Sequence, residues 1–492
     1  MASRNSTYLP FEIILMVARA LVEDDDNLAR FATVSRDWQR IIESHNFAQI
    51  RLTPSRIAEL DVMTRRNRGR VRYLWLCLEL EQYGCSPPSP KTLVMKAFQD
   101  LFSVLRAWEP NGFLSLDVSV YSTSNAEHCF NYITSEPDLP KKGSHDQEVG
   151  QGRMARARAA ISRSLDFVDK FEWDEDEEGE YGEERDEWWR HLPPVPAVTR
   201  LLLRQQTRQR WTPQALANIL ALLPRLRELY YEPFRAEQDD SFEEFTDFGN
   251  PHHAHMDAVD AVHADDADDT DDKDDTDDTD DIDDIDDIEH VYPLFPPAVQ
   301  DYASLIRPPN HALSEALATV SRNLESISGA FMVDAGLFFG PISYPFVKRR
   351  PNLKTLVLTS QLLAPDERQK NIVKMLQEAA SAAMHMPQLE TMTIWNGRRK
   401  LAALFKYERT REHQISTVTW RGTWHFNLPP SLIKAWEAVA AKYSGYGLDV
   451  VHESLDGDDV MSHGDAIAIL KLPELVIRPV SLQQIRRDPC WR

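Results

Sequence analysis

A short apolar pattern recurs along this chain and constrains its fold more than any other feature. Each copy has the form x-x-Leu-x-x-φ-x-φ, where φ is apolar, and alternating apolar positions are typical of a strand with one buried face. The fullest copies span residues 224–231, 322–327, 351–358 and 387–394, and weaker copies span 71–76, 198–203 and 415–420. We therefore expect seven short strands that bury equivalent positions.

Helical patterns separate these strands, as the apolar spacing predicts for 213–223, 366–384 and 431–443. Equivalent strand positions follow one another at regular intervals. The steps are 28 residues from Leu201 to Leu229, 29 from Ile327 to Leu356, 36 from Leu356 to Met392, and 26 from Met392 to Val418. One strand and one helix per about 20–29 residues is typical of leucine-rich repeats. The units resemble diverged repeats of this kind, and they predict an irregular solenoid. An open doubly wound α/β sheet is the alternative.

The N-terminal residues predict three short helices. Leu9-Pro10 begins the first, because a proline in the first turn loses no intrahelical hydrogen bond. A second short helix is expected to carry Leu28 and Phe31, and Ser35 is expected to cap a third. So small a unit cannot bury all its large apolar side chains, so we expect some of them to face a partner.

This arrangement resembles the F-box, the adaptor-docking module of Skp–cullin–F-box ubiquitin ligases. The resemblance rests on Leu9-Pro10, Glu12-Ile13, Val17 and the Val34-Ser35-Arg36-x-Trp38 signature, within residues 7–50. It implies that a Skp-type adaptor, and through it a cullin, meets a surface formed by Leu9, Pro10, Ile13, Val17, Leu28, Val34 and Trp38. Two features depart from the pattern: the loop after the first helix is acidic and lacks a proline, and Phe47 stands where a tryptophan often closes the motif.

The whole chain resembles the F-box proteins with irregular leucine-rich repeats that are abundant in filamentous fungi. Its C-terminal part also looks like an uncharacterised region of such proteins, with an apolar stretch between Pro473 and Pro479 that we expect to form a strand. The resemblance implies a non-catalytic subunit that holds a protein substrate near the ubiquitin-charged partner. In a repeat array the outward strand residues form the binding surface. On this basis the expected substrate-binding residues are Trp75, Arg204, Tyr230, Thr359, Trp395 and Arg421.

Two other functional classes stay open at this point. The first is an F-box-like interaction or scaffold protein that acts outside cullin ligases, with its acidic insert binding basic partners. The second is an enzyme in the C-terminal region. The sequence contains no H-E-x-x-H, no G-x-S-x-G and no phosphate-binding G-x-x-x-x-G-K-[ST] motif. We therefore expect no enzymatic activity, no catalytic residues, no cofactor and no metal.

The net charge of −23 is concentrated in two inserts. Residues 257–289 contain eighteen Asp and carry −18, and residues 172–187 carry −10, so the remainder carries +5. Dense like charges repel and bury little, so both inserts are expected to be disordered. The expected organisation is an F-box-like module at 7–50, a linker with first repeat-like units at 51–195, and repeats at 196–235. A disordered Asp-rich insert at 236–295 and a repeat-like region at 296–490 follow.

The four cysteines are scattered and form no C-x-x-C pair, which argues against a disulfide framework. No stretch reaches the roughly 18 apolar residues of a membrane span. We expect an intracellular protein, cytoplasmic or nuclear, that binds neither membrane nor nucleic acid.

Overall fold

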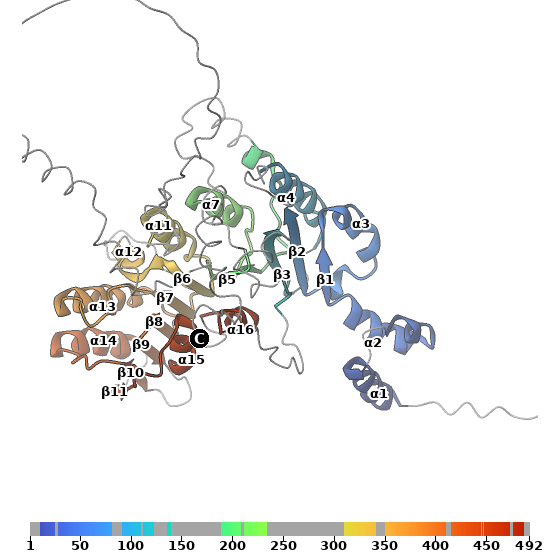
Figure 1. Ribbon diagram of the computed structural model, residues 1–492. Coiled ribbons are helices and arrows are strands. Elements are labelled where there is room, and N and C mark those ends of the chain that lie inside the picture. Colours follow the sequence, from blue (N-terminus) through green and yellow to red (C-terminus); the bar gives the residue numbers. More distant parts are fainter. Residues whose placement is uncertain are drawn as a thin grey trace, which may run out of the picture. The chain divides into compact units, whose positions relative to one another are not determined.

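The computed structural model describes residues 10–24, 28–80, 91–109, 112–122, 135–138, 188–207, 211–233, 309–340, 350–409, 415–443, 445, 447–472 and 476–486. These residues form helices and one large sheet, so the predicted α/β class is confirmed (Figure 1). The expected acidic inserts at 172–187 and 236–295, and Leu9, lie outside the described residues.

The eleven strands of the described sheet lie side by side in sequence order. They are β1 (Gln49–Leu52), β2 (Tyr73–Leu80), β3 (Ser115–Ser122), β4 (Arg200–Leu203), β5 (Glu228–Tyr231), β6 (Ser326–Asp334), β7 (Thr355–Thr359), β8 (Thr391–Arg398), β9 (Leu401–Arg409), β10 (Ser416–Gly422) and β11 (Leu448–Ser454). Neighbours are parallel except that β9 is antiparallel to β8 and β10. A doubly wound sheet requires a reversal in its strand order. The described sheet contains no such reversal, so it does not match the doubly wound alternative.

The predicted equivalence of apolar strand positions is confirmed by the register of the sheet. Leu201 pairs with Leu229, Leu229 with Ile327, Ile327 with Leu356, and Leu356 with Met392. All five side chains are buried in one hydrophobic core. This row lies on what we call the helix face of the sheet, because apolar residues of the connecting helices pack on it.

Most helices follow the strands along the helix face (Figure 1). The helices are α1 (Phe11–Asp24), η1 (Leu28–Thr33), α2 (Arg36–Asn46), α3 (Pro54–Thr64), η2 (Arg68–Arg70), α4 (Lys91–Leu105), α7 (Pro213–Ala221), α11 (His311–Val320), α12 (Ala335–Phe339), α13 (Gln369–Ala383), α14 (Pro430–Tyr443), α15 (His463–Ile469) and α16 (Pro479–Arg486). The helices predicted at 213–223, 366–384 and 431–443 are confirmed as α7, α13 and α14. Capping residues begin two of the helices. Ser35, as expected, accepts from the Trp38 N–H, and Thr212 accepts from the Ala215 N–H.

Several regions differ from the sequence-based expectation, and the first is strand β1, which was not predicted. Strand β3 was not predicted, although Leu116, Val118 and Val120 alternate as a strand requires. Strand β9 forms a hairpin with β8 and lies between it and β10, so the 26-residue step from Met392 to Val418 spans two strands. The strand expected between Pro473 and Pro479 lies partly outside the described residues; in the described part Ile477 forms an isolated β-bridge, and helix α16 begins at Pro479.

Helices α15 and α16 cover the opposite side of the sheet, which we call the second face. Ile467 and Leu470 of the α15 region pack with Val357, Trp395 and Leu404 of β7, β8 and β9 in a second hydrophobic core. The sheet is therefore buried on both sides where α15 lies. Close-packed interiors tolerate little extra volume, so this contact depends on small residues.

Gly397 of β8 lies against Ala466 of α15. A Cβ atom at this position would lie 2.6 Å from the Ala466 Cβ, too close for two carbon atoms. We expect Gly397→Ala to lower the free energy of unfolding by about 1–3 kcal/mol, because α15 must shift. Chemical denaturation measures the loss. The control is Gly340→Ala, where a Cβ would meet no described atom within 4 Å. An equal, small change in both variants would contradict the tight contact.

Candidate functional site

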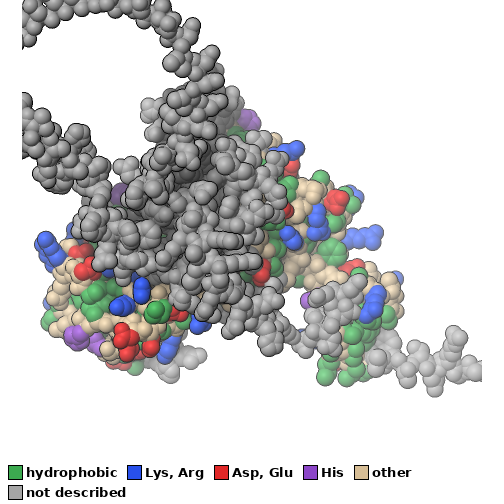
Figure 2. Space-filling view, in the orientation of Figure 1, with side chains coloured by type: hydrophobic (Ala, Val, Ile, Leu, Met, Phe, Trp, Pro, Cys, Tyr) green, Lys and Arg blue, Asp and Glu red, His purple; other side chains and the backbone are tan. Residues whose placement is uncertain are grey.

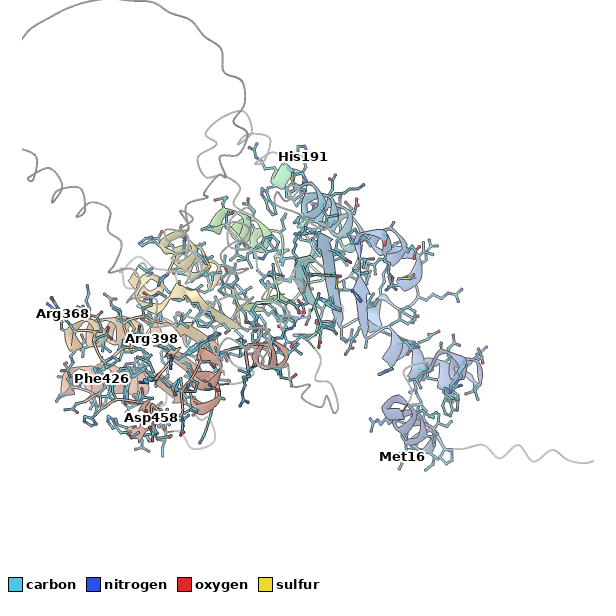
Figure 3. All side chains as sticks on the ribbon, in the orientation of Figure 1. Met16, His191, Arg368, Arg398, Phe426 and Asp458 are labelled. Atoms are coloured by element: carbon cyan, nitrogen blue, oxygen red, sulfur yellow. The ribbon has the colours of Figure 1, made fainter. Side chains whose placement is uncertain are left out.

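Helix α1 has one buried and one exposed apolar face. Ile14 and Ala18 are buried, and α1 contacts α2. The exposed face carries Ile13 at 41%, Val17 at 42% and Met16 at 65% exposure. Met16 lies on the outer side of α1 (Figure 3), and hydrophobic side chains gather over this helix in Figure 2. The helix therefore leaves part of its apolar surface exposed within the described residues.

Val34 adds a further exposed apolar side chain to this module. It lies at the junction of η1 and α2 and is 63% exposed. Trp38 of α2 is half-buried, and its ring centroid lies 6.1 Å from that of Phe31 in η1. Pro10 is exposed at the start of α1. We call the exposed apolar residues of this module the N-terminal apolar surface; its members are Phe11, Ile13, Met16, Val17 and Val34.

The predicted adaptor-binding residues divide between this surface and the interior. Ile13, Val17 and Val34 are exposed, but Leu28 is only 2% exposed, so its predicted place on the surface is wrong. Leu28 begins η1, and η1 packs on α2, which buries the side chain. Phe11 and Met16 were not predicted. Helical spacing could have revealed them, because positions three and four apart lie on one face.

The predicted row of substrate-binding residues is mostly covered. Trp75, Arg204, Thr359 and Trp395 are between 0 and 5% exposed, so their expected exposure to a partner is wrong. Tyr230 is half-buried. Arg421 keeps 13% of its side chain exposed, and it donates to Glu453 Oε2 at 2.7 Å and to the Leu470 carbonyl at 2.7 Å. Strand alternation did place these residues on the second face, but other parts of the chain pack against that face.

A buried ion pair lies where β3 and β4 meet on the second face. Asp117 Oδ2 accepts from Arg204 Nε at 2.8 Å and lies 2.7 Å from Nη2, and neither side chain has exposed surface. The Tyr73 hydroxyl donates to the same carboxylate oxygen. Arg204 Nη2 also donates to the Glu136 carbonyl at 2.6 Å, which ties residues 135–138 to this site. Burial raises the pKa of Asp117, and the charge of Arg204 opposes that rise.

A second buried carboxylate, Glu232, follows β5 on the same face. It is 2% exposed, and its Oε1 accepts from the Arg478 backbone N–H at 2.6 Å. The Arg478 side chain donates through Nε to Asp138 Oδ2 at 2.5 Å, and its guanidinium lies 5.3 Å from the Tyr230 ring centroid. Burial raises the pKa of Glu232 to about 7. The second face therefore holds a polar cluster beneath the C-terminal residues, formed by Tyr73, Asp117, Asp138, Arg204, Glu232 and Arg478.

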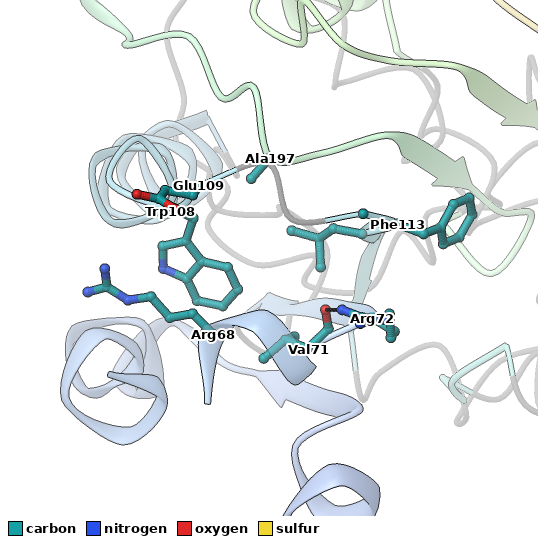
Figure 4. Close-up of a pocket in the computed structure, with 9 residues that line it drawn as sticks. Arg68, Val71, Arg72, Trp108, Glu109, Phe113 and Ala197 are labelled. Atoms are coloured by element: carbon teal, nitrogen blue, oxygen red, sulfur yellow. Dashed lines mark hydrogen bonds between the residues drawn. The ribbon is translucent and has the colours of Figure 1, made fainter. Parts of the chain in front are cut away.

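The second face also holds a buried thiol. Cys77 on the same face is a free thiol, and burial raises its pKa to about 12, so it stays protonated and unreactive. A pocket elsewhere is lined by Arg68, Arg72, Trp108, Glu109 and Phe113 among others (Figure 4). Its volume is about 10 Å³, enough for one water molecule.

The described part of the chain holds neither a metal-binding cluster nor a helix that could span a membrane. No group of three or more His, Cys, Asp or Glu residues there could hold a metal ion. None of its helices combines the length and the apolar character needed to cross a membrane.

Comparison with known proteins gives one family match. Residues 277–478 match a family of unknown function (DUF6546), which covers 202 of the 492 residues. The described part of that match includes β6 to β11 and α15, and therefore much of the second hydrophobic core. No curated protein matches the chain.

Proposed function

We propose that this protein is the substrate-recognition subunit of a Skp–cullin–F-box ubiquitin ligase. In this proposal the N-terminal apolar surface docks a Skp-type adaptor, and the repeat region holds a protein substrate. The protein performs no bond chemistry itself; it raises the local concentration of the substrate near the ubiquitin-charged partner. The proposal rests on the F-box-like sequence of residues 7–50 together with the exposure of its apolar residues.

The exposure of these residues is the observation that carries the proposal. Five large apolar side chains on a module of three short helices are 41–65% exposed, while Ile14, Ala18, Leu28 and Ile42 form its interior. Grouped exposed apolar side chains mark interaction sites in soluble proteins. An adaptor that covers Ile13, Val17 and Val34 would remove these side chains from water, and that burial would contribute to binding free energy.

The repeat region supports the second half of the proposal through its strand order. Parallel strands that follow one another without reversal and carry their connecting helices on one side are typical of a solenoid of leucine-rich-repeat type. Helices α15 and α16 cover much of the second face. A substrate could therefore contact only those residues of this face that remain accessible. The half-buried Tyr230, flanked by the guanidinium groups of Arg200 and Arg478, is the strongest such candidate.

Binding to a Skp-type adaptor tests the proposal directly. We expect the full chain to bind the adaptor in isothermal titration calorimetry, and the double variant Ile13→Ala/Val17→Ala to bind at least about thirtyfold more weakly, a loss of about 2 kcal/mol. Both side chains are 41–42% exposed, so the variant should keep its helical content.

The matched control is Val62→Ala, which removes a 78% exposed apolar side chain on α3, outside the N-terminal apolar surface. This variant should bind as tightly as the parent. A well-folded parent that fails to bind would contradict the ligase proposal and leave an F-box-like interaction protein outside cullin ligases as the better account. Equal binding by the parent and the double variant would contradict the assignment of the surface.

A further inference from the structure

A small pocket lies among the loops that lead into β2, β3 and β4 (Figure 4). It is lined by Arg68 of η2 and the residues at 71–72, by the residues at 108–109 and 112–114 that follow α4, and by Ala197 before β4. Its volume of about 10 Å³ accommodates one oxygen atom of the size of a water molecule. None of its lining residues belongs to the N-terminal apolar surface or to the polar cluster of the second face.

Two hydrogen-bond donors that line this pocket have no acceptor among the described residues. Trp108 is 4% exposed, and its Nε1 is buried without a partner. Arg68 Nε is also buried without a partner, although the Nη2 atom of the same side chain donates to Asp61 Oδ1. The Arg68 side chain lies beside the Trp108 indole in Figure 4. Because an unpaired buried donor is costly, two of them at one pocket indicate a site for an acceptor atom.

A carboxylate oxygen suits this pocket better than a water molecule. Water must also donate its two hydrogens, whereas a carboxylate only accepts. Arg72 lines the pocket as a second cation, and its Nη1 donates to the Gly69 carbonyl at 2.7 Å. The one carboxylate among the lining residues, Glu109, is exposed to solvent. The lining therefore offers two guanidinium groups and one indole N–H to a negatively charged acceptor.

The charge around the pocket also favours a negative ligand. Residues 61–72 and 106–109 contain six arginines but only two acidic residues. Two of these arginines pair with carboxylates, Arg68 with Asp61 and Arg70 with Glu43. The other four are exposed, and no described carboxylate pairs with them; they are Arg65, Arg66, Arg72 and Arg106. Four exposed guanidinium groups near one pocket attract acidic ligands.

We propose that this pocket binds a carboxylate group carried by an acidic peptide segment of a partner protein. One carboxylate oxygen accepts from Arg68 Nε and from Trp108 Nε1, and the exposed arginines attract neighbouring acidic residues of the same segment. The site does not depend on adaptor docking, because its lining residues lie outside residues 7–50.

The indole N–H signal of Trp108 tests the site by NMR on the full chain labelled with 15N-tryptophan. Trp108→Phe identifies this signal among those of the twelve tryptophans. Sodium acetate is the probe, and acetamide is its neutral match, with the ionic strength held constant by sodium chloride. We expect acetate to shift the Trp108 signal saturably and acetamide to bind at least about tenfold more weakly, because an ionised acceptor forms the stronger hydrogen bonds. No saturable shift with acetate, or equal affinities for the two probes, would overturn the carboxylate site.

Arg68→Lys tests the role of the Arg68 Nε donor. It keeps the positive charge but removes the N–H that faces the pocket, so the acetate affinity should fall about tenfold. Arg70→Lys is the matched control within η2. Both arginines pair with a carboxylate, and their side chains are 30% and 29% exposed, but only Arg68 lines the pocket. The control should keep the parental affinity, and equal losses in both variants would contradict the assignment of Arg68.

Two peptides test whether an acidic segment supplies the carboxylate: N-acetyl tetra-aspartate amide and its tetra-asparagine counterpart. The aspartate peptide should shift the same Trp108 signal with at least about tenfold higher affinity than acetate, because the exposed arginines add charge contacts. The asparagine peptide should not shift it. An aspartate peptide that binds no more tightly than acetate would overturn the peptide assignment, since the pocket would then select small carboxylates alone.

Discussion

Replacing Arg204 with alanine is expected to lower the free energy of unfolding by about 3–5 kcal/mol, because Asp117 would be left as a buried charge without its partner. Both side chains of this pair have no exposed surface. The loss of Arg204 also removes the hydrogen bond to the Glu136 carbonyl, so residues 135–138 lose a contact with the sheet. Chemical denaturation with urea, followed by circular dichroism, measures the change.

Strand β4 supplies its own matched control. Arg200, at the other end of the strand, pairs with Glu228, but 27% and 22% of the two side chains are exposed. Because solvent screens partly exposed pairs, Arg200→Ala should cost at most about 1 kcal/mol. Equal losses for Arg200→Ala and Arg204→Ala would contradict the role of burial. The double variant Arg204→Met/Asp117→Leu should lose less than Arg204→Ala alone, since it removes both charges of the pair.

Replacing Trp395 with alanine is expected to cost about 3–5 kcal/mol, because the ring fills the second hydrophobic core. Trp395 has no exposed surface, and its ring centroid lies 5.7 Å from that of Phe331 in an edge-to-face arrangement. Hydrogen exchange should show that α15 loses protection in this variant, because the ring lies in the core that receives α15. The amides of α4, which packs in the other core, should keep theirs.

The control for Trp395→Ala is Val451→Ala on β11, since Val451 is 38% exposed. An exposed position of this kind should change the stability by no more than about 0.5 kcal/mol. A small effect of Trp395→Ala, with no change in α15, would contradict the structural role of the ring. It would instead favour the sequence-based expectation that Trp395 serves a partner.

Much of the fold was predictable because local chemistry and regular spacing govern it. The positions of Leu201, Leu229, Ile327, Leu356 and Met392 were expected to be equivalent, and they are partners across the sheet. Helices α7, α11, α12 and α13 lie between these strands along the chain, and two of them, α7 and α13, were predicted from apolar spacing. Strand β9 was missed, since an antiparallel hairpin needs only a short turn and leaves the repeat spacing intact.

The N-terminal surface was predictable in part. Helical spacing and the F-box-like pattern identified Ile13, Val17 and Val34, which are exposed. The same pattern placed Leu28 on the surface, but η1 packs its side chain into the module. The buried Leu28 and the exposed Ile13 are both large and apolar. The sequence alone does not show which of them a neighbouring helix covers.

The sequence by itself determined the α/β class, the equivalent buried positions of the predicted strands and the face of the sheet on which each residue of those strands lies. Those properties depend on spacing within a few tens of residues. Only the tertiary structure decided that the second face is covered, so that Arg204 and Trp395 are buried and Glu232 titrates near neutral pH. The covering residues lie about 70–280 positions away in the chain. Contacts at such separations depend on how the whole sheet is assembled, which no local pattern encodes.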